Sequence, residues 1–210
     1  MDAIKAGWFS EVNDLWPGVA LSLEIEEVLH SERSQFQDIL VVKTKSHGKA
    51  LMLDGVIQCT EKDEMSYHEM ISYLSLCNHP KPEHVIGGGD GGTVREVLKH
   101  PDVKTVTLVE IDDRVIEVCK QYLPGLSLNL NNPKVNISIG DGFKYLRDHL
   151  GEFDVIITDS SDPKTNLAEP IRIFSDEELN RMSMSYYNDK VHRAAFILPR
   201  FVEKAFARCL

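Results

Sequence analysis

A glycine-rich segment constrains this chain more than any other feature. Residues 84–97 read HVIGGGDGGTVREV, which is an apolar run, a glycine turn and the first turns of a helix. Gly87, Gly89 and Gly92 have the G-x-G-x-x-G spacing of a nucleotide-binding loop. Glycine suits such a loop because the backbone must turn sharply and let a ligand come close. The spacing alone is a weak signal, since glycine-rich turns also occur where nothing binds.

Two acidic residues sharpen this interpretation. Glu110 ends the next apolar run, about 20 residues after the glycines, where a carboxylate that binds ribose hydroxyls belongs. It could instead only cap the following helix. Asp90 lies inside the loop, and its carboxylate would repel a pyrophosphate. We therefore expect a nucleoside without phosphates, whose tail near the loop is neutral or cationic, rather than a nicotinamide dinucleotide.

Composition limits the partners. The 210 residues carry a formal net charge of -10 at pH 7, which argues against nucleic acid or an anionic membrane as a partner. No apolar run approaches transmembrane length, and the first residues lack the pattern of a secretory signal. The 4 cysteines are scattered without a C-x-x-C motif, which predicts reduced thiols, no zinc site and a cytoplasmic protein.

The hydrophobic periodicity changes along the chain. Residues 1–63 show short alternating runs and a hairpin signal at Asp54-Gly55, which predict a small antiparallel β domain. A helical period begins at Glu64. The apolar face that we expect on this helix consists of Tyr67, Met70, Ile71, Leu74 and Cys77.

From His84 onward, predicted strands and helices alternate, which is typical of parallel strands joined by crossover helices. We therefore expect residues 64–210 to form an α/β domain with a Rossmann-like, methyltransferase-type doubly wound sheet. The alternation stops after Pro163, so the sheet should be incomplete after its fourth strand, 153–158. Ser175 and Glu178 have the spacing of a capping box and predict a helix to about residue 187, and 201–208 could form a last short helix.

Ligands of such sheets bind outside the carboxyl ends of the strands, and each of the four predicted ends carries an acidic residue. Asp141 could cap the helix that follows or recognise adenine, and we give the two roles equal weight. The group 159–162, Asp-Ser-Ser-Asp, could bind a metal, cap a loop, or bind a cationic amine with one carboxylate as base. We rank the metal site low because the sequence places no further histidine or carboxylate ligand beside this group. Tyr67 and His68 could add an aromatic wall and polar contacts, although a lone histidine is more often structural.

The chain resembles the spermidine synthase (polyamine aminopropyltransferase) family along nearly its whole length. The motifs that carry the resemblance are Gln37–Val41, Leu53–Glu61, Asp63–Glu64, Tyr67–Met70, Gly87–Gly92, Val109–Asp112, Gly140–Phe143, Asp154–Pro163, Tyr186–Asn188 and His192–Phe196. The resemblance implies transfer of an aminopropyl group from decarboxylated S-adenosylmethionine to putrescine, which yields spermidine and methylthioadenosine. It implies no cofactor, no metal and a cytoplasmic homodimer or higher homo-oligomer.

The resemblance also implies roles for individual residues. The residues expected to bind the nucleoside donor are Gln37, His68, Asp90, Glu110, Asp141 and Gly142. Many relatives have glutamine at the position of His68. The residues expected to hold putrescine are Tyr67, Asp159, Ser160, Ser161 and Asp162, with Asp159 as the general base.

The chain departs from the family pattern after Lys164. Relatives continue with further helices and three more strands, whereas this chain passes to a segment that resembles the family's C-terminal tail. The missing part includes a tyrosine that contacts putrescine in relatives, and its loss should leave the strand 153–158 at an edge of the sheet. Two alternatives follow. One is an S-adenosylmethionine-dependent methyltransferase acting on putrescine, and the other is a non-catalytic truncated chain that pairs with full-length subunits.

Overall fold

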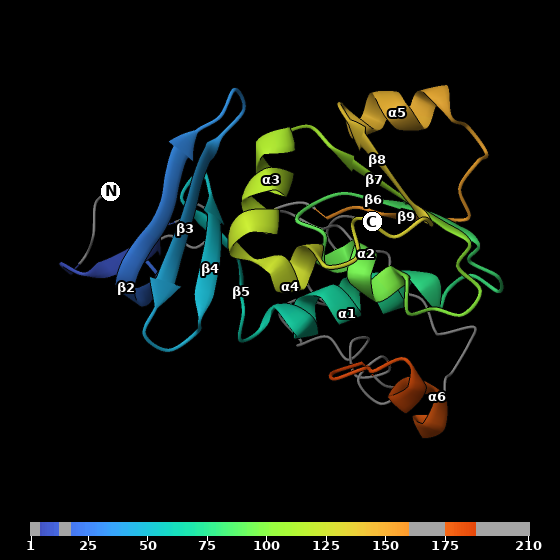
Figure 1. The fold of residues 1–210 in the computed structure, drawn as a ribbon, viewed down its shortest axis with the longest axis horizontal. Coiled ribbons are helices and arrows are strands. Elements are labelled where there is room, and N and C mark those ends of the chain that lie inside the picture. Colours follow the sequence, from blue (N-terminus) through green and yellow to red (C-terminus); the bar gives the residue numbers. More distant parts are fainter. Residues whose placement is uncertain (1–4, 13–17, 160–174, 188–210) are drawn as a thin grey trace.

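The computed structural model describes residues 5–12, 18–159 and 175–187. An antiparallel sheet contains β1 (Trp8–Val12), β2 (Ala20–Arg33), β3 (Asp38–Thr44), β4 (Lys49–Leu53) and β5 (Val56–Thr60). A parallel sheet contains β6 (His84–Gly87), β7 (Thr105–Glu110), β8 (Val135–Ile139) and β9 (Val155–Ile157). The helices are α1 (Glu64–Leu76), α2 (Gly92–Val97), α3 (Asp113–Tyr122), α4 (Pro124–Ser127), α5 (Gly142–Asp148) and α6 (Asp176–Arg181). Figure 1 shows α3 and α4 between the two sheets.

The antiparallel sheet has the strand order β1-β2-β3-β4-β5. Asp54 (φ 49) and Gly55 (φ 81) both adopt positive φ in the turn between β4 and β5. This is the conformation that an Asp-Gly hairpin turn requires, and it confirms the predicted hairpin. Leu23 on β2 is buried, but Leu21, which pairs with Glu11 on β1, is exposed.

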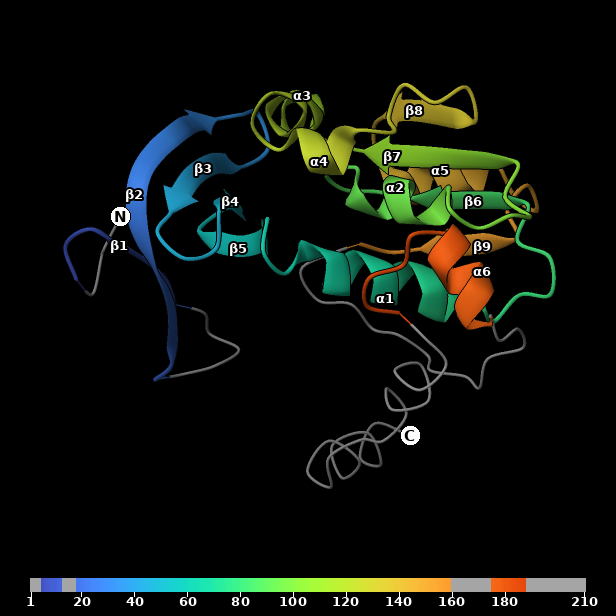
Figure 2. The same cartoon turned by 60° about the horizontal axis from the view of Figure 1, so that its bottom comes forward.

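The parallel sheet has the strand order β8-β7-β6-β9, and every neighbouring pair is parallel. Figure 2 shows α1 and α2 on one face of the sheet and α5 on the other. The predicted α/β, Rossmann-like doubly wound sheet is therefore confirmed. Within the described residues β9 pairs only with β6, as expected for an edge strand, and Ile156 on β9 is 53% exposed.

Helix α1 buries only part of the face that the apolar pattern predicts, since of that face Ile71 and Cys77 are buried. Tyr67 is 37% exposed, and Leu74 is only half-buried. The buried residues of the helix are His68, Glu69, Ile71, Ser72, Tyr73 and Leu76. The prediction was incomplete because it counted apolar residues only, whereas the buried polar side chains of α1 include an ion-paired histidine and a hydrogen-bonded carboxylate.

The segment 175–187 packs against α1. The Glu69 carboxylate accepts hydrogen bonds from the backbone N–H groups of Ser185 (2.7 Å), Tyr186 (2.6 Å) and Tyr187 (2.5 Å). The capping box of Ser175 is confirmed, but α6 ends at Arg181 rather than near residue 187. Positive φ at Ser183 (55°) does not fit a continuing α-helix. The helix predicted at 201–208 lies outside the described residues.

The two sheets share an apolar cluster. It consists of Ile39, Val41, Leu51, Cys59, Val115, Val118, Cys119, Leu123 and Leu126. These residues come from β3 to β5 on one side and from α3 and α4 on the other, so the antiparallel sheet packs on the helix layer of the parallel one. Among the described residues, no helix is both long enough and apolar enough to cross a bilayer.

Candidate functional site

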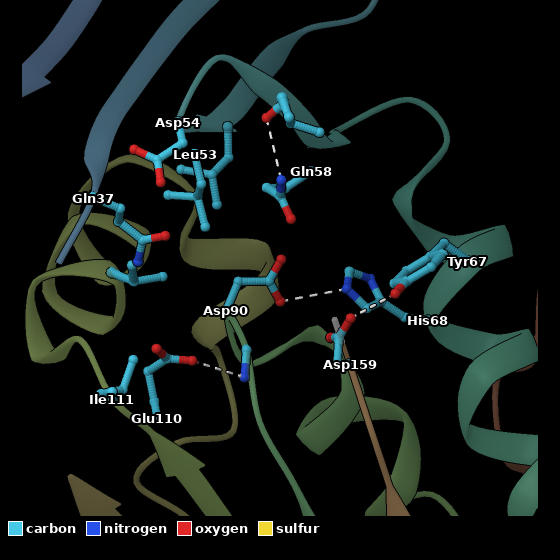
Figure 3. A pocket seen from close by; sticks show the side chains of 14 residues that line it. Gln37, Leu53, Asp54, Gln58, Tyr67, His68, Asp90, Glu110, Ile111 and Asp159 are labelled. Atoms are coloured by element: carbon cyan, nitrogen blue, oxygen red, sulfur yellow. Dashed lines mark hydrogen bonds and ion pairs between the residues drawn. The ribbon is translucent and has the colours of Figure 1, made fainter. Parts of the chain in front are cut away.

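A pocket of about 310 Å³ lies where the carboxyl ends of the parallel strands face the β4–β5 hairpin. Its polar lining includes six residues that the sequence predicts, namely Gln37, Tyr67, His68, Asp90, Glu110 and Asp159. Its apolar lining consists of Leu51, Leu53, Val56, Ile111 and Val115. Figure 3 shows the polar side chains converging on one space from both sheets and from α1.

The glycines of the loop are required by close packing as well as by backbone conformation. Gly89 has φ +97, and a Cβ atom there would lie 2.7 Å from the Asp159 carboxylate. A Cβ atom at Gly92 would lie 2.4 Å from the imidazole ring of His68. The loop therefore lets two side chains of the pocket approach its backbone, which a larger residue at either position would prevent.

The Asp90 carboxylate is held in place from three directions. It accepts a hydrogen bond from the backbone N–H of Gly92 (2.8 Å), contacts Nε2 of His68 (3.4 Å) and accepts from the Cys59 thiol (3.5 Å). Burial favours the neutral acid, but the contacts with His68 and Gly92 outweigh burial and lower the pKa of Asp90. The pocket therefore presents a fixed negative charge next to the glycine loop.

His68 is the counter-charge to Asp90. Its side chain is 1% exposed, and Nδ1 lies 2.7 Å from Glu64, which in turn forms an ion pair with Arg95. Burial opposes protonation, but hydrogen bonds to Asp90 and Glu64 outweigh it and raise the pKa of His68 to about 10. The structure thus gives this histidine both a structural role and a place in the pocket wall.

The raised pKa of His68 predicts a pH-dependent stability. The ordinary value is about 6.5, so its contribution to the free energy of unfolding should be complete below that pH and be lost as the pH rises towards about 10. We expect His68→Gln to remove this part of the fall in the free energy of unfolding with rising pH. Urea denaturation from pH 6 to pH 10 measures it. His47→Gln, which changes a histidine at the β3–β4 turn, is the control and should keep the wild-type slope. An unchanged slope in His68→Gln would show that His68 is neutral.

Tyr67 and Asp159 form the part of the pocket wall that lies beside the glycine loop. The Tyr67 hydroxyl donates to Oδ1 of Asp159 (2.5 Å), and the Thr93 hydroxyl donates to Oδ2 (3.3 Å). Burial raises the pKa of Asp159, the Tyr67 hydrogen bond lowers it in part, and the charge of Asp90 raises it further. Ser160, Ser161 and Asp162 lie outside the described residues, so their roles stay predictions.

Glu110 lies at the end of β7, as the sequence predicts. Its carboxylate accepts hydrogen bonds from the backbone N–H groups of Gly89 (3.3 Å) and Asp112 (3.0 Å). Burial raises its pKa, while these backbone hydrogen bonds act in the opposite direction. Gln37 reaches the same pocket from the β2–β3 hairpin and donates its side-chain amide to Asp112 (3.0 Å).

Asp141 and Gly142 lie outside the lining of this pocket. Asp141 caps α5, because its carboxylate accepts from the backbone N–H groups of Phe143 (2.8 Å) and Lys144 (3.2 Å). Gly142 lines a smaller hollow of about 190 Å³, and Asp159 lines both hollows. The capping role of Asp141 is thus observed, while its recognition of adenine stays a prediction.

Sequence reasoning missed three supporting residues. Thr93 holds the second oxygen of Asp159, Cys59 contacts Asp90, and Glu64 braces His68. Of these, only Glu64 carried a usable signal, because residues four apart on a helix lie next to each other and it precedes His68 by that spacing. The contacts of Thr93 and Cys59 join distant parts of the chain.

Comparisons with known proteins agree with this geometry. Residues 64–191 match the spermine/spermidine synthase domain, and residues 7–61 match the spermidine synthase tetramerisation domain. The spermidine synthase of Dictyostelium discoideum is 56% identical over 165 residues, which cover 78% of this chain and 58% of that protein. The spermidine synthase of Schizosaccharomyces pombe is 55% identical over 162 residues, covering 76% and 54%. The chain thus spans little more than half the length of these relatives.

Solved structures give the same answer for the fold. The crystal structure of spermidine synthase from Thermotoga maritima matches with a TM-score of 0.82 at 30% identity, covering 94% of this chain and 93% of that chain. A spermidine synthase in complex with the transition state analogue AdoDATO also has a TM-score of 0.82, at 29% identity and 94% coverage of both chains. From its matched domain, which covers more than half of its length, the chain belongs to the spermine/spermidine synthase family.

Proposed function

We propose that this chain transfers an aminopropyl group from decarboxylated S-adenosylmethionine to putrescine, giving spermidine and methylthioadenosine. One observation carries the proposal: the carboxylates of Asp90, Glu110 and Asp159 line one pocket, at the strand ends where a doubly wound sheet binds its ligand. The names of the relatives and the structure with AdoDATO support the same reaction.

The charge of Asp90 favours this donor over S-adenosylmethionine itself. An ionised carboxylate beside the glycine loop attracts an aminopropyl ammonium and repels the carboxylate that S-adenosylmethionine carries. Glu110, which Figure 3 shows on the side of Asp90 away from Tyr67, is placed to accept hydrogen bonds from the ribose hydroxyls. The lining therefore weighs against the alternative of a putrescine methyltransferase.

Asp159 is the proposed general base. The attacking amine has an ordinary pKa of about 10, by analogy with lysine, so it arrives protonated. Asp159 first takes a proton from this ammonium group, and the lone pair that is freed then bonds the nitrogen to the carbon next to the sulfonium. The carbon–sulfur bond breaks, its electron pair returns to sulfur, and methylthioadenosine leaves. Tyr67 and Thr93 orient the carboxylate for this step through their hydrogen bonds.

The proposed assembly is a homodimer or a higher homo-oligomer formed through the antiparallel sheet. Residues 7–61 match a domain named for tetramerisation, and Val12, Leu21 and Val28 are exposed on β1 and β2. Sedimentation at several concentrations would measure the assembly. The described cysteines Cys59, Cys77 and Cys119 are buried thiols, which supports a reducing, cytoplasmic setting.

The deciding experiment offers the purified chain putrescine with each donor in turn. Spermidine and methylthioadenosine from the decarboxylated donor would support the proposal. Methylated putrescine from S-adenosylmethionine would favour the methyltransferase. No turnover with either donor, together with co-purification with a full-length spermidine synthase, would favour the non-catalytic alternative.

Glu110→Gln should weaken methylthioadenosine binding by roughly 1.5–3 kcal/mol, the value of a hydrogen bond to a charged group. The physical reason is the loss of the carboxylate that faces the ribose hydroxyls in the proposed complex. Calorimetry measures the change, and Glu152→Gln, an exposed glutamate after α5, is the control. Equal affinity of Glu110→Gln and the wild type would place the ribose elsewhere.

A further inference from the structure

The loop between β2 and β3 contacts the N-cap residue of helix α3. Asp112 precedes α3 and is 1% exposed. Its carboxylate meets the hairpin loop 34–37, which comes from the other sheet. The contact joins sequence positions that are more than seventy residues apart, and neither partner's sequence pattern indicates it.

The two oxygens of Asp112 have separate partners. Oδ1 accepts from the backbone N–H of Arg114 (3.2 Å) and so caps α3. Oδ2 accepts from the Ser34 hydroxyl (2.6 Å) and from Nε2 of Gln37 (3.0 Å). The oxygen of Ser34 in turn accepts from the backbone N–H groups of Phe36 and Gln37, at 3.0 Å each. One oxygen therefore serves the helix and the other fixes the loop.

This arrangement decides what Gln37 offers to a ligand. A side-chain amide has donors on one branch and an acceptor oxygen on the other. Because Asp112 takes a hydrogen bond from the NH₂ group, Oε1 is the branch left for the pocket that Gln37 lines. In Figure 3 that oxygen faces the space in front of Asp90. The pocket wall at this point is thus a hydrogen-bond acceptor.

Asp112 also acts on Glu110. Its backbone N–H donates to Oε1 of Glu110 at 3.0 Å. The side-chain cap holds the backbone of Asp112 in its extended conformation (φ -111, ψ 97), which directs this N–H. One residue outside the lining of the pocket therefore orients two residues inside it, one from each sheet.

We propose that Asp112 is a positioning residue for the donor: through Oδ2 it fixes Gln37 as an acceptor, and through its backbone it fixes Glu110. The inference rests on the proposed function, since it assigns both groups to the nucleoside donor. Two acceptors that line one pocket select a ligand that presents hydroxyl or ammonium donors to both walls.

Asp112→Asn separates positioning from capping. Asparagine caps helices as well as aspartate does, so the contact with Arg114 can persist. The new NH₂ group, however, faces the NH₂ group of Gln37, and two donors cannot bond. Gln37 must turn, and it then presents NH₂ to the pocket in place of the oxygen. Asp113→Asn is the matched control, because it removes a charge from the next, exposed residue of α3.

The first readout needs no ligand. The side-chain amide signals of Gln37 in a ¹H–¹⁵N spectrum, assigned with Gln37→Ala, should shift in Asp112→Asn and stay unchanged in Asp113→Asn. The second readout is binding. We expect about 10-fold weaker binding of methylthioadenosine and a similar rise in KM for the decarboxylated donor, as for a lost hydrogen bond to a polar group. The kcat and the KM for putrescine should change little.

A double variant tests whether the effect passes through Gln37. In a Gln37→Ala background, Asp112→Asn should add little to the loss of affinity. Unmoved Gln37 signals, or a loss that persists in that background, would overturn the proposal. Wild-type protein that binds no methylthioadenosine would overturn the proposed function and the donor role together. Wild-type binding with an unaffected Asp112→Asn would overturn only the role of Asp112.

Discussion

Asp159→Asn should lower turnover by a factor of about 10²–10⁴ while the nucleoside still binds, which is the usual contribution of a general base. Asparagine can keep the hydrogen bond from Tyr67 through its amide oxygen, but it cannot take a proton from the attacking amine. Because burial raises the pKa of Asp159, the wild-type rate should fall as the pH drops and the carboxylate becomes protonated. Steady-state kinetics with saturating donor measure the effect, and the acid limb of the profile should disappear in the variant.

The control for this variant is Asp148→Asn, which makes the same change at an exposed position on α5. Its turnover should equal that of the wild type. Melting curves of both variants would show that they are folded. Near-normal turnover of Asp159→Asn would mean that another group accepts the proton, and the carboxylate would then serve only to bind the amine.

Glu69→Gln should have the largest effect on stability. Glu69 is buried, and its two oxygens accept three backbone N–H groups from 185–187. The glutamine NH₂ group cannot accept, so at least one of these three donors loses its partner, at roughly 1–3 kcal/mol. The free energy of unfolding of a domain is only about 5–15 kcal/mol, so the loss is a substantial fraction. Urea denaturation measures it.

Glu177→Gln on α6 is the matched control, since its weak contact with Arg181 is at the surface and should contribute little. Limited proteolysis adds a local readout. Cleavage within 175–187 should become faster in Glu69→Gln and stay unchanged in Glu177→Gln. If Glu69→Gln kept wild-type stability and resistance, α1 would not depend on this segment, and the contact would be incidental to folding.

The sheets and the position of the pocket could be predicted from local patterns. Asp54 and Gly55 are a turn signal by themselves, and the acidic residue at each parallel strand end is visible in the sequence. Parallel strands with crossover helices bring such ends to one edge, which is why Asp90, Glu110 and Asp159 meet. Asp141 shows the limit of this reasoning, since a strand end alone does not say whether a carboxylate caps a helix or faces the pocket.

What could not be predicted depends on contacts between distant parts of the chain. Apolar periodicity gave only part of the inner face of α1, because His68 and Glu69 are buried by partners whose positions only the fold determines. The link between Gln37 and Asp112 is of the same kind. The effect of Asp90 on the pKa of Asp159 likewise needs the three-dimensional distances, since three crossovers separate the two residues in the sequence.

The apolar cluster that β3 to β5 share with α3 and α4 holds the two sheets together, and the pocket has walls from both sheets. A ligand that touches both walls binds only when the two sheets are packed together, so its binding energy stabilises both sheets at once. At a concentration 100 times its Kd, this linkage amounts to about 2.7 kcal/mol. A change that destabilises the antiparallel sheet, far from any reacting atom, therefore lowers the fraction of molecules in which the two sheets are packed together. The apparent affinity for the ligand falls with that fraction.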